Sequence, residues 1–196
     1  MKKLLDYFLE INKIKDVERY TVHHKVFHES VADHSFMMIV LATKFIDELN
    51  LDLDFKKVIE LVTNHDFCEI GLSADYDAVA AKVDAKYYDE KKSFETQNIE
   101  KFSNRYGKKM LMLHDEYVKQ ETREAKFVKA LDKLETNIYE VFRGVEYFGS
   151  PDFIALYPKK AVMAFPELIP FYKEFLVQMK QLYEKTGYAW KEEYDV

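Results

Sequence analysis

Residues 61–71 read LVTNHDFCEIG, and this stretch begins like the end of a helix that faces the core. His65 and Asp66 then stand side by side, and Glu69 follows one helical turn later. Burying an unpaired imidazole or carboxylate costs several kcal/mol, so these groups need hydrogen-bonded partners or a metal ion. The fold must therefore bring other polar side chains to this point.

Residues 31–49 contain a second polar group within an apolar pattern. Apolar side chains recur there at spacings of three and four, which predicts a helix with one buried face. His34 lies on that apolar stripe. Ser30 followed by Asp33 resembles a capping box, in which the hydroxyl and the carboxylate bind free amide groups of the first turn. The sequence thus predicts a helix that starts just before His34.

Most of the remaining chain is also predicted to be helical. Residues 122–146 repeat the apolar periodicity, with Thr122 as a possible N-cap and Asp132 bordering the apolar face. No segment shows convincing strand alternation, and the chain has only 5 Gly and 4 Pro. The prediction is an all-α protein with further helices over residues 54–69, 85–106, 107–119 and about 166–186. Residues 70–84, with a short helical turn, and residues 151–160 are predicted to be loops.

The length of the chain indicates one domain. At 196 residues it is long enough for one good-sized hydrophobic core and short for two. It contains no repeat, no low-complexity tract and no obvious linker. We therefore predict a single domain over residues 1–196, with a motif-bearing core over about 19–146 and a C-terminal helical part over 147–196.

Composition argues against several classes of function. The 29 basic and 35 acidic residues give a net charge of −6, which disfavours general affinity for nucleic acids or anionic membranes. Charged residues interrupt the N-terminal apolar residues, and no segment approaches the roughly 18 uncharged residues of a membrane span. The single cysteine, Cys68, allows no internal disulfide. We expect a soluble cytoplasmic protein whose partner is a small molecule.

Three predicted helices each carry a polar side chain on or beside an inward face. His34 comes from the first, His65 and Asp66 from the second, and Asp132 from the third. Two imidazoles and two carboxylates make a plausible cage for one divalent cation, with further positions open to water or substrate. The alternative is a hydrogen-bonded polar cluster in the core, which is the commoner role of a single histidine on an apolar stripe.

At these residues the sequence resembles the HD superfamily of metal-dependent phosphohydrolases, and most closely its branch of bacterial 5′-deoxynucleotidases. The resemblance runs from about Arg19 to Glu135 and is carried by ESVADHS (29–35), HDFCEI (65–70) and HDEYVKQETREAKFVKALDKLE (114–135). It implies a helical bundle around one divalent metal ion, which is Mn²⁺, Co²⁺, Mg²⁺, Fe²⁺ or Zn²⁺. The ligands that it implies are His34, His65, Asp66 and Asp132.

The resemblance also implies residues that contact the substrate. Arg19 matches an arginine that binds the phosphate, and its planar fork suits two phosphate oxygens. Tyr20 stands where the family usually has a Trp that crowds the sugar 2′ position, so discrimination against ribose is in doubt. The alternative for Arg19 is a solvated surface arginine.

Two carboxylates are expected to take part in proton transfer. Glu69 matches the glutamate of the family motif. The family aspartate five residues later falls on Ala74, so we assign Asp75 by allowing one inserted residue. A nucleoside oxygen leaves poorly unless it is protonated, which calls for a general acid such as Glu69 or Asp75.

The resemblance therefore implies hydrolysis of deoxynucleoside 5′-monophosphates by a homodimeric enzyme with one metal ion. Binuclear relatives carry further histidines before the last aspartate, and here only His114 lies in that segment. Two alternatives remain open. One is an HD hydrolase acting on deoxynucleoside triphosphates or guanosine tetraphosphate. The other is a nucleotide-binding protein without turnover.

Overall fold

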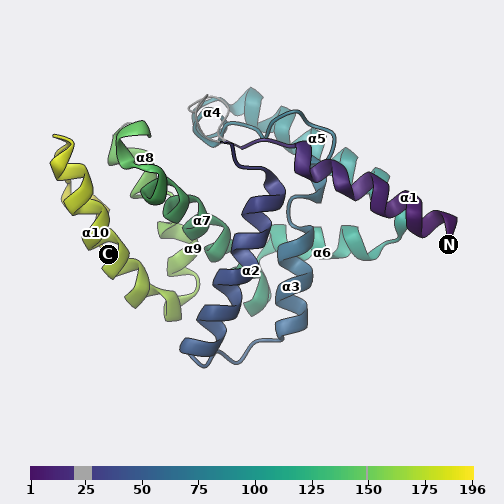
Figure 1. Cartoon of the computed structure of the whole chain (residues 1–196), viewed down its shortest axis with the longest axis horizontal. Helices are drawn as coiled ribbons and strands as arrows, with labels where there is room; N and C mark the ends of the chain where they lie inside the picture. The colour runs from purple at the N-terminus through teal and green to yellow at the C-terminus, as the bar shows by residue number, and fades with distance from the viewer. Residues whose placement is uncertain (20–27, 149) are drawn as a thin grey trace.

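The computed structural model describes residues 1–19, 28–148 and 150–196, and it is built of helices (Figure 1). No strand occurs in these ranges, where only isolated bridges pair extended residues. The all-α prediction is confirmed. The helices are α1 Lys2–Ile11, α2 Val31–Glu48, α3 Phe55–Asn64, α4 Ala78–Val83, α5 Ala85–Tyr106, α6 Lys109–Lys119, α7 Arg123–Arg143, α8 Pro151–Ile154, α9 Lys159–Met163 and α10 Ile169–Lys185. Short 3₁₀ turns occupy Asn12–Asp16, Phe67–Glu69, Val145–Tyr147, Pro166–Leu168 and Glu192–Tyr194.

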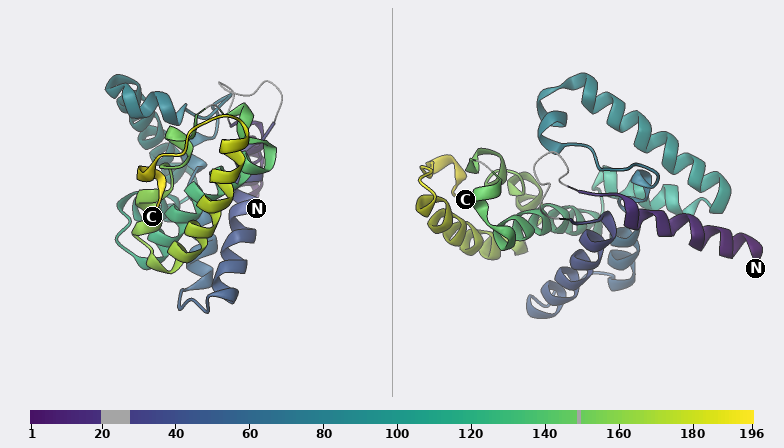
Figure 2. Two further views of the ribbon diagram at one scale, coloured as in Figure 1. Left: turned by 90° about the vertical axis from the view of Figure 1, so that its left-hand side faces the viewer. Right: turned by 45° about the horizontal axis from the view of Figure 1, so that its top comes forward.

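Helix α7 is the central element of the bundle. It packs against α2, α3, α6 and α9. Helices α8 and α10 lie at one end of the molecule, and α1 lies at the other (Figures 1 and 2). The main core gathers buried side chains of α2, α3, α7 and α10, and a smaller cluster joins α5 to the turn after α1. The central position of α7 puts its inward face within reach of most other helices.

The helix starts that the sequence predicted are confirmed where side chains cap them. Ser30 accepts a hydrogen bond from the amide of Asp33, and the Asp33 carboxylate accepts one from the amide of Ser30, which completes a capping box. The Thr122 hydroxyl accepts a hydrogen bond of 3.2 Å from the amide of Ala125. These caps are local interactions, and they fix where α2 and α7 begin.

Helix α3 ends five residues earlier than the predicted limit at residue 69. Asn64 Nδ2 donates to the carbonyl of Glu60 at 2.8 Å, and His65 Nδ1 donates to the carbonyl of Val62 at 2.7 Å. The His65 side chain occupies the carbonyl of Val62, which the amide of Asp66 would need in a further helical turn. Asp66 then leaves the helical conformation with φ −108° and ψ 14°. The prediction of a continuous helix through His65 and Glu69 is wrong for this reason.

The predicted loop over residues 151–160 is also wrong in part, because α8 begins there and α9 starts at its end. Pro151 is the first residue of α8, and Pro158 immediately precedes α9. Proline breaks a helix interior but fits its first turn, where its fixed φ is favourable and no amide is needed. Within the described residues, no helix is long and apolar enough to cross a membrane.

Candidate metal centre

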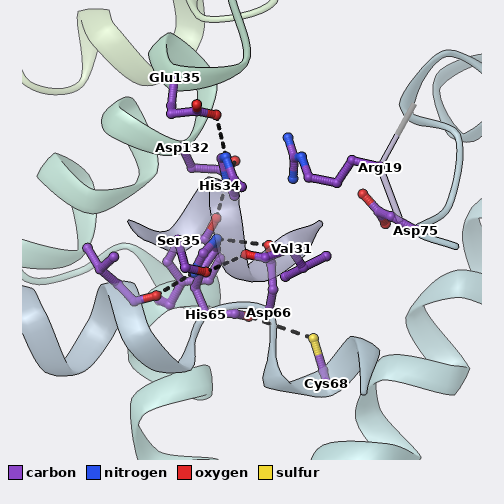
Figure 3. Close-up of polar contacts among 12 residues, drawn as sticks. Arg19, Val31, His34, Ser35, His65, Asp66, Cys68, Asp75, Asp132 and Glu135 are labelled. Carbon is purple, nitrogen blue, oxygen red and sulfur yellow. Dashed lines mark hydrogen bonds and ion pairs between the residues drawn. The ribbon is translucent and has the colours of Figure 1, made fainter. Parts of the chain in front are cut away.

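The four predicted metal ligands converge from three parts of the bundle (Figure 3). His34 comes from the second turn of α2, His65 and Asp66 follow the end of α3, and Asp132 lies in the middle of α7. His34, His65 and Asp66 each offer a ligand atom, and these atoms lie within 4.8 Å of one another. The Asp132 Oδ1 atom lies 3.6 Å from His34 Nε2.

The two imidazoles are oriented by contacts at their Nδ1 atoms. A carbonyl can only accept, so His65 Nδ1 carries the proton that it donates to Val62, and its Nε2 lone pair is free. His34 Nδ1 makes a short contact with the carboxylate of Glu135. Both Nε2 atoms are buried and have no hydrogen-bond partner among the described residues. Two buried lone pairs beside carboxylates are the donor set that a divalent metal ion fits.

The spacing of His65 and Asp66 also fits adjacent ligands. His65 Nε2 lies 2.9 Å from Asp66 Oδ2, yet the pair does not form a hydrogen bond. Two atoms that bind one ion at right angles, each at about 2.1 Å, are about 3 Å apart. The spacing of the two atoms therefore fits two neighbouring ligands of one ion.

The field around His34 favours a positive charge. Burial and Arg19 lower the pKa of His34, but the neighbouring carboxylates of Asp132 and Glu135 outweigh both and raise the pKa to about 9. A metal ion on Nε2 would replace this proton, because metal binding and protonation compete for the same lone pair.

Asp132 offers one oxygen to the centre and uses the other for protein contacts. Its Oδ2 atom accepts from Tyr117 at 2.5 Å and from Lys129 at 3.2 Å, and it lies 3.0 Å from Lys133 Nζ. Burial raises the pKa of Asp132, but Lys133 and Lys129 lower it by more and hold it well below its usual range. With Oδ2 occupied by three donors, Oδ1 is the atom directed at His34. Lys129, Lys133 and Tyr117 were not predicted from the sequence.

Glu135 is a further residue that the sequence analysis did not single out. It is buried, and its contact with His34 Nδ1 fixes the direction of the imidazole. The sequence could have pointed to Glu135 through its position three residues after Asp132, which puts both carboxylates on one helical face.

We expect Glu135→Gln to weaken metal binding about 10- to 100-fold, because a neutral amide supports His34 less well than a carboxylate. Competition between the protein and a chelating dye for Mn²⁺ measures this affinity. Glu121→Gln, at an exposed position, serves as the control. Equal affinity in all three proteins would show that Glu135 does not support a metal ligand.

The two predicted acids lie on the cavity wall next to the centre. Glu69 is buried, and its Oε2 atom has no hydrogen-bond partner in the described part of the chain. Burial and the nearby Asp66 and Asp75 raise the pKa of Glu69 well above its usual value. Asp75 is half-buried, and its Oδ1 atom lies 3.4 Å from Lys91 Nζ. The surroundings of Glu69 therefore favour its protonated form, and Asp75 lies beside the Lys91 cation.

Arg19 is buried, which excludes the solvated surface arginine. Its Nε atom donates to Glu29 at 3.1 Å, and one terminal nitrogen donates to Thr136 at 3.1 Å. The side chain lines the same cavity as Asp66 and Asp75, and Figure 3 shows Arg19 and Asp75 together beside the ligands. Tyr20, the predicted neighbour of the sugar, lies outside the described residues.

The metal centre opens into a cavity of about 500 Å³. One side is formed by α5, which contributes Lys91, and another by the segment after α7, which contributes Phe148 and Tyr157. Among the described residues, seven acidic side chains and five lysine or arginine side chains line it. His114 also reaches the cavity, and its buried Nδ1 atom has no hydrogen-bond partner among the described residues.

Comparison with known proteins gives matches in family and in fold. The model of the family described as HD domain matches residues 11–147. No curated protein sequence matches the chain. Among solved structures, a predicted metal-dependent phosphohydrolase from Magnetospirillum magnetotacticum has a TM-score of 0.61 at 19% identity, covering 85% of this chain and 83% of that one.

Two further solved structures are similar. An HD-domain phosphohydrolase from Listeria innocua has a TM-score of 0.64 at 19% identity, covering 91% of this chain and 89% of its own. A conserved hypothetical protein from Pyrococcus furiosus has a TM-score of 0.61 at 24% identity, covering 87% of this chain and 99% of its own. At these identities the similarity shows a common fold.

Proposed function

Because this chain belongs to the HD domain family, we propose that it is a metal-dependent phosphohydrolase that converts deoxynucleoside 5′-monophosphates to nucleosides and phosphate. The observation that carries the proposal is the pair of buried Nε2 atoms, on His34 and His65, that face two carboxylates and have no hydrogen-bond partner in the described ranges. One divalent ion would be held by His34, His65, Asp66 and Asp132.

The side chains around the centre supply what phosphate-ester hydrolysis needs. A divalent ion supplies positive charge that stabilises phosphate oxygens and makes an attacking water more acidic. Arg19 offers charged N–H groups at the cavity wall, which suits binding of a phosphate oxygen. Glu69, whose raised pKa favours the protonated form, is suited to give a proton to the departing nucleoside oxygen.

The cavity supports a monophosphate as the substrate. Its volume of about 500 Å³ lies within the usual range for sites that bind small molecules. Beside the acidic side chains that line the cavity, a dianionic monophosphate is accommodated at lower electrostatic cost than a triphosphate with about four negative charges. The expected homodimer and the cytoplasmic location stay predictions.

Phosphate release from a panel of deoxy- and ribonucleoside 5′-monophosphates, with Mn²⁺, Co²⁺ or Mg²⁺, tests the proposal. We expect metal-dependent release from the deoxy forms. The proposal fails if the metal-loaded protein releases phosphate from no monophosphate, and triphosphates and guanosine tetraphosphate are then the next substrates to test.

Arg19→Lys is expected to lower kcat/KM for these esters about 10- to 100-fold, because lysine keeps the charge but loses the planar fork. The conservative change also retains a cation beside the buried Glu29. Arg123→Lys, in the exposed ion pair with Glu167, is the matched control. Unchanged kinetics in Arg19→Lys would remove Arg19 from the phosphate site.

A further inference from the structure

Glu140 is a buried carboxylate that lines the cavity and has no role in the metal centre. The residue is 5% exposed, and its Oε2 atom has no hydrogen-bond partner within the described residues. Burial raises the pKa of Glu140 to about 8. The charge of Arg19 lowers this pKa, and the charges of Glu29 and Glu135 raise it further. An unsatisfied buried acceptor destabilises the fold. Its position on a cavity wall suggests that a ligand supplies the missing donor.

Glu140 lies on the same face of α7 as Asp132, the residue of this helix that belongs to the metal centre. Asp132, Thr136 and Glu140 are four residues apart, so they share one face of the helix, and all three line the cavity. A helix rises 1.5 Å per residue, which places Glu140 about 12 Å beyond Asp132 along the axis. This face of α7 therefore runs from the metal ligand, past the residue that holds Arg19, to Glu140.

The protein does not neutralise Glu140 with a cation. Arg19 lowers the pKa of Glu140 through its charge, but it donates hydrogen bonds to Glu29 and to Thr136. No salt bridge joins Glu140 to a lysine or arginine in the described part of the chain. The carboxylate is thus kept available for a group that enters the cavity.

Apolar surface adjoins the same part of the fold. Phe148 and Ile154, from the segment that follows α7, line the cavity together with Tyr157. Apolar walls with a few polar groups are typical of sites that hold a ring and fix its orientation by hydrogen bonds.

We propose that Glu140 determines substrate specificity by accepting a hydrogen bond from a hydroxyl or amino group on the organic part of the phosphate ester. The inference rests on the proposed function, because it requires a phosphate that is bound by the metal centre and Arg19. A phosphate held there orients the rest of the ester along α7. The donor belongs either to the sugar or to the base, and both present the same chemistry to a carboxylate.

Glu140→Met tests this inference, since methionine has similar length and no acceptor oxygen. We expect kcat/KM for deoxycytidine 5′-monophosphate to fall about 10- to 100-fold, the usual effect of leaving a buried donor without its hydrogen-bond partner. Hydrolysis of 4-nitrophenyl phosphate, whose organic group has no donor, should stay within about twofold. The melting temperature without substrate should rise by about 3 °C or more, because an unsatisfied buried group is gone.

Two further variants sharpen the comparison. Glu140→Gln retains the shape and a neutral acceptor, so its loss with the nucleotide should be smaller than that of Glu140→Met. Glu184→Met, at an exposed position on α10, should change neither substrate. Assays with 2-deoxyribose 5-phosphate identify the donor. A loss seen also with this sugar phosphate assigns it to the sugar, and a loss confined to the nucleotide assigns it to the base.

The outcomes separate this inference from the proposed function. If both esters lose activity equally, or if the melting temperature of Glu140→Met falls, Glu140 is a structural residue and the inference is wrong. If the wild-type protein hydrolyses no nucleotide, the proposed function fails, and calorimetry with Mn²⁺ and a nucleoside 5′-phosphonate tests Glu140 alone. Binding by the wild type that weakens about tenfold or more in Glu140→Met supports the inference. No binding, or equal binding, overturns it.

Discussion

Asp66→Ala is expected to lower phosphate release about 10³-fold or more, because a lost ligand removes several kcal/mol of transition-state stabilisation. Asp66 Oδ2 lies 2.9 Å from His65 Nε2 and on the wall of the cavity. The substitution removes the carboxylate next to the His65 imidazole, which is a proposed ligand. Asp66 lies outside regular helix, so truncation to alanine breaks no helical turn.

Metal content separates loss of the centre from loss of catalysis alone. Purified wild-type protein should contain about one equivalent of divalent metal after reconstitution, and Asp66→Ala should retain much less. Asp89→Ala, at an exposed position on α5, is the matched control and should behave as the wild type. If Asp66→Ala keeps its metal and its activity, the assigned ligand set is wrong. If neither protein binds metal even after addition, the four side chains form a polar cluster.

Phe127→Ala is expected to lower the free energy of unfolding by about 3–5 kcal/mol, the usual range for removing a fully buried aromatic ring. The Phe127 side chain is completely buried in the main core, and its ring centroid lies 5.1 Å from that of Phe165. The change leaves a cavity between α7 and the segment that leads to α10. Urea denaturation followed by circular dichroism measures the loss.

The same helix offers a matched control for this prediction. Phe142 is 76% exposed, so Phe142→Ala removes the same atoms without opening a cavity. Its effect on the free energy of unfolding should stay within about 1 kcal/mol. Similar losses in the two variants would contradict the assignment of Phe127 to the core.

Local patterns in the sequence predicted the elements that carry the centre. The capping box at Ser30 and the N-cap at Thr122 depend on residues within one turn, and both helix starts are confirmed. The same local reasoning failed after α3, where His65 and Asn64 use their side chains to bind carbonyls of their own helix. Competition of this kind depends on side-chain conformation, which periodicity does not report.

The amino-acid sequence by itself determined that the protein is helical and that His34, His65, Asp66 and Asp132 are the candidates for one site. Periodicity reports which face of a helix is buried, and motif spacing reports residue type. Only the tertiary structure decided that Glu135 orients His34, that two lysines hold one oxygen of Asp132, and that Oε2 of Glu140, on the cavity wall, has no hydrogen-bond partner among the described residues. These relations are distances between side chains, and such distances are fixed by how the helices pack and not by where each helix begins or ends.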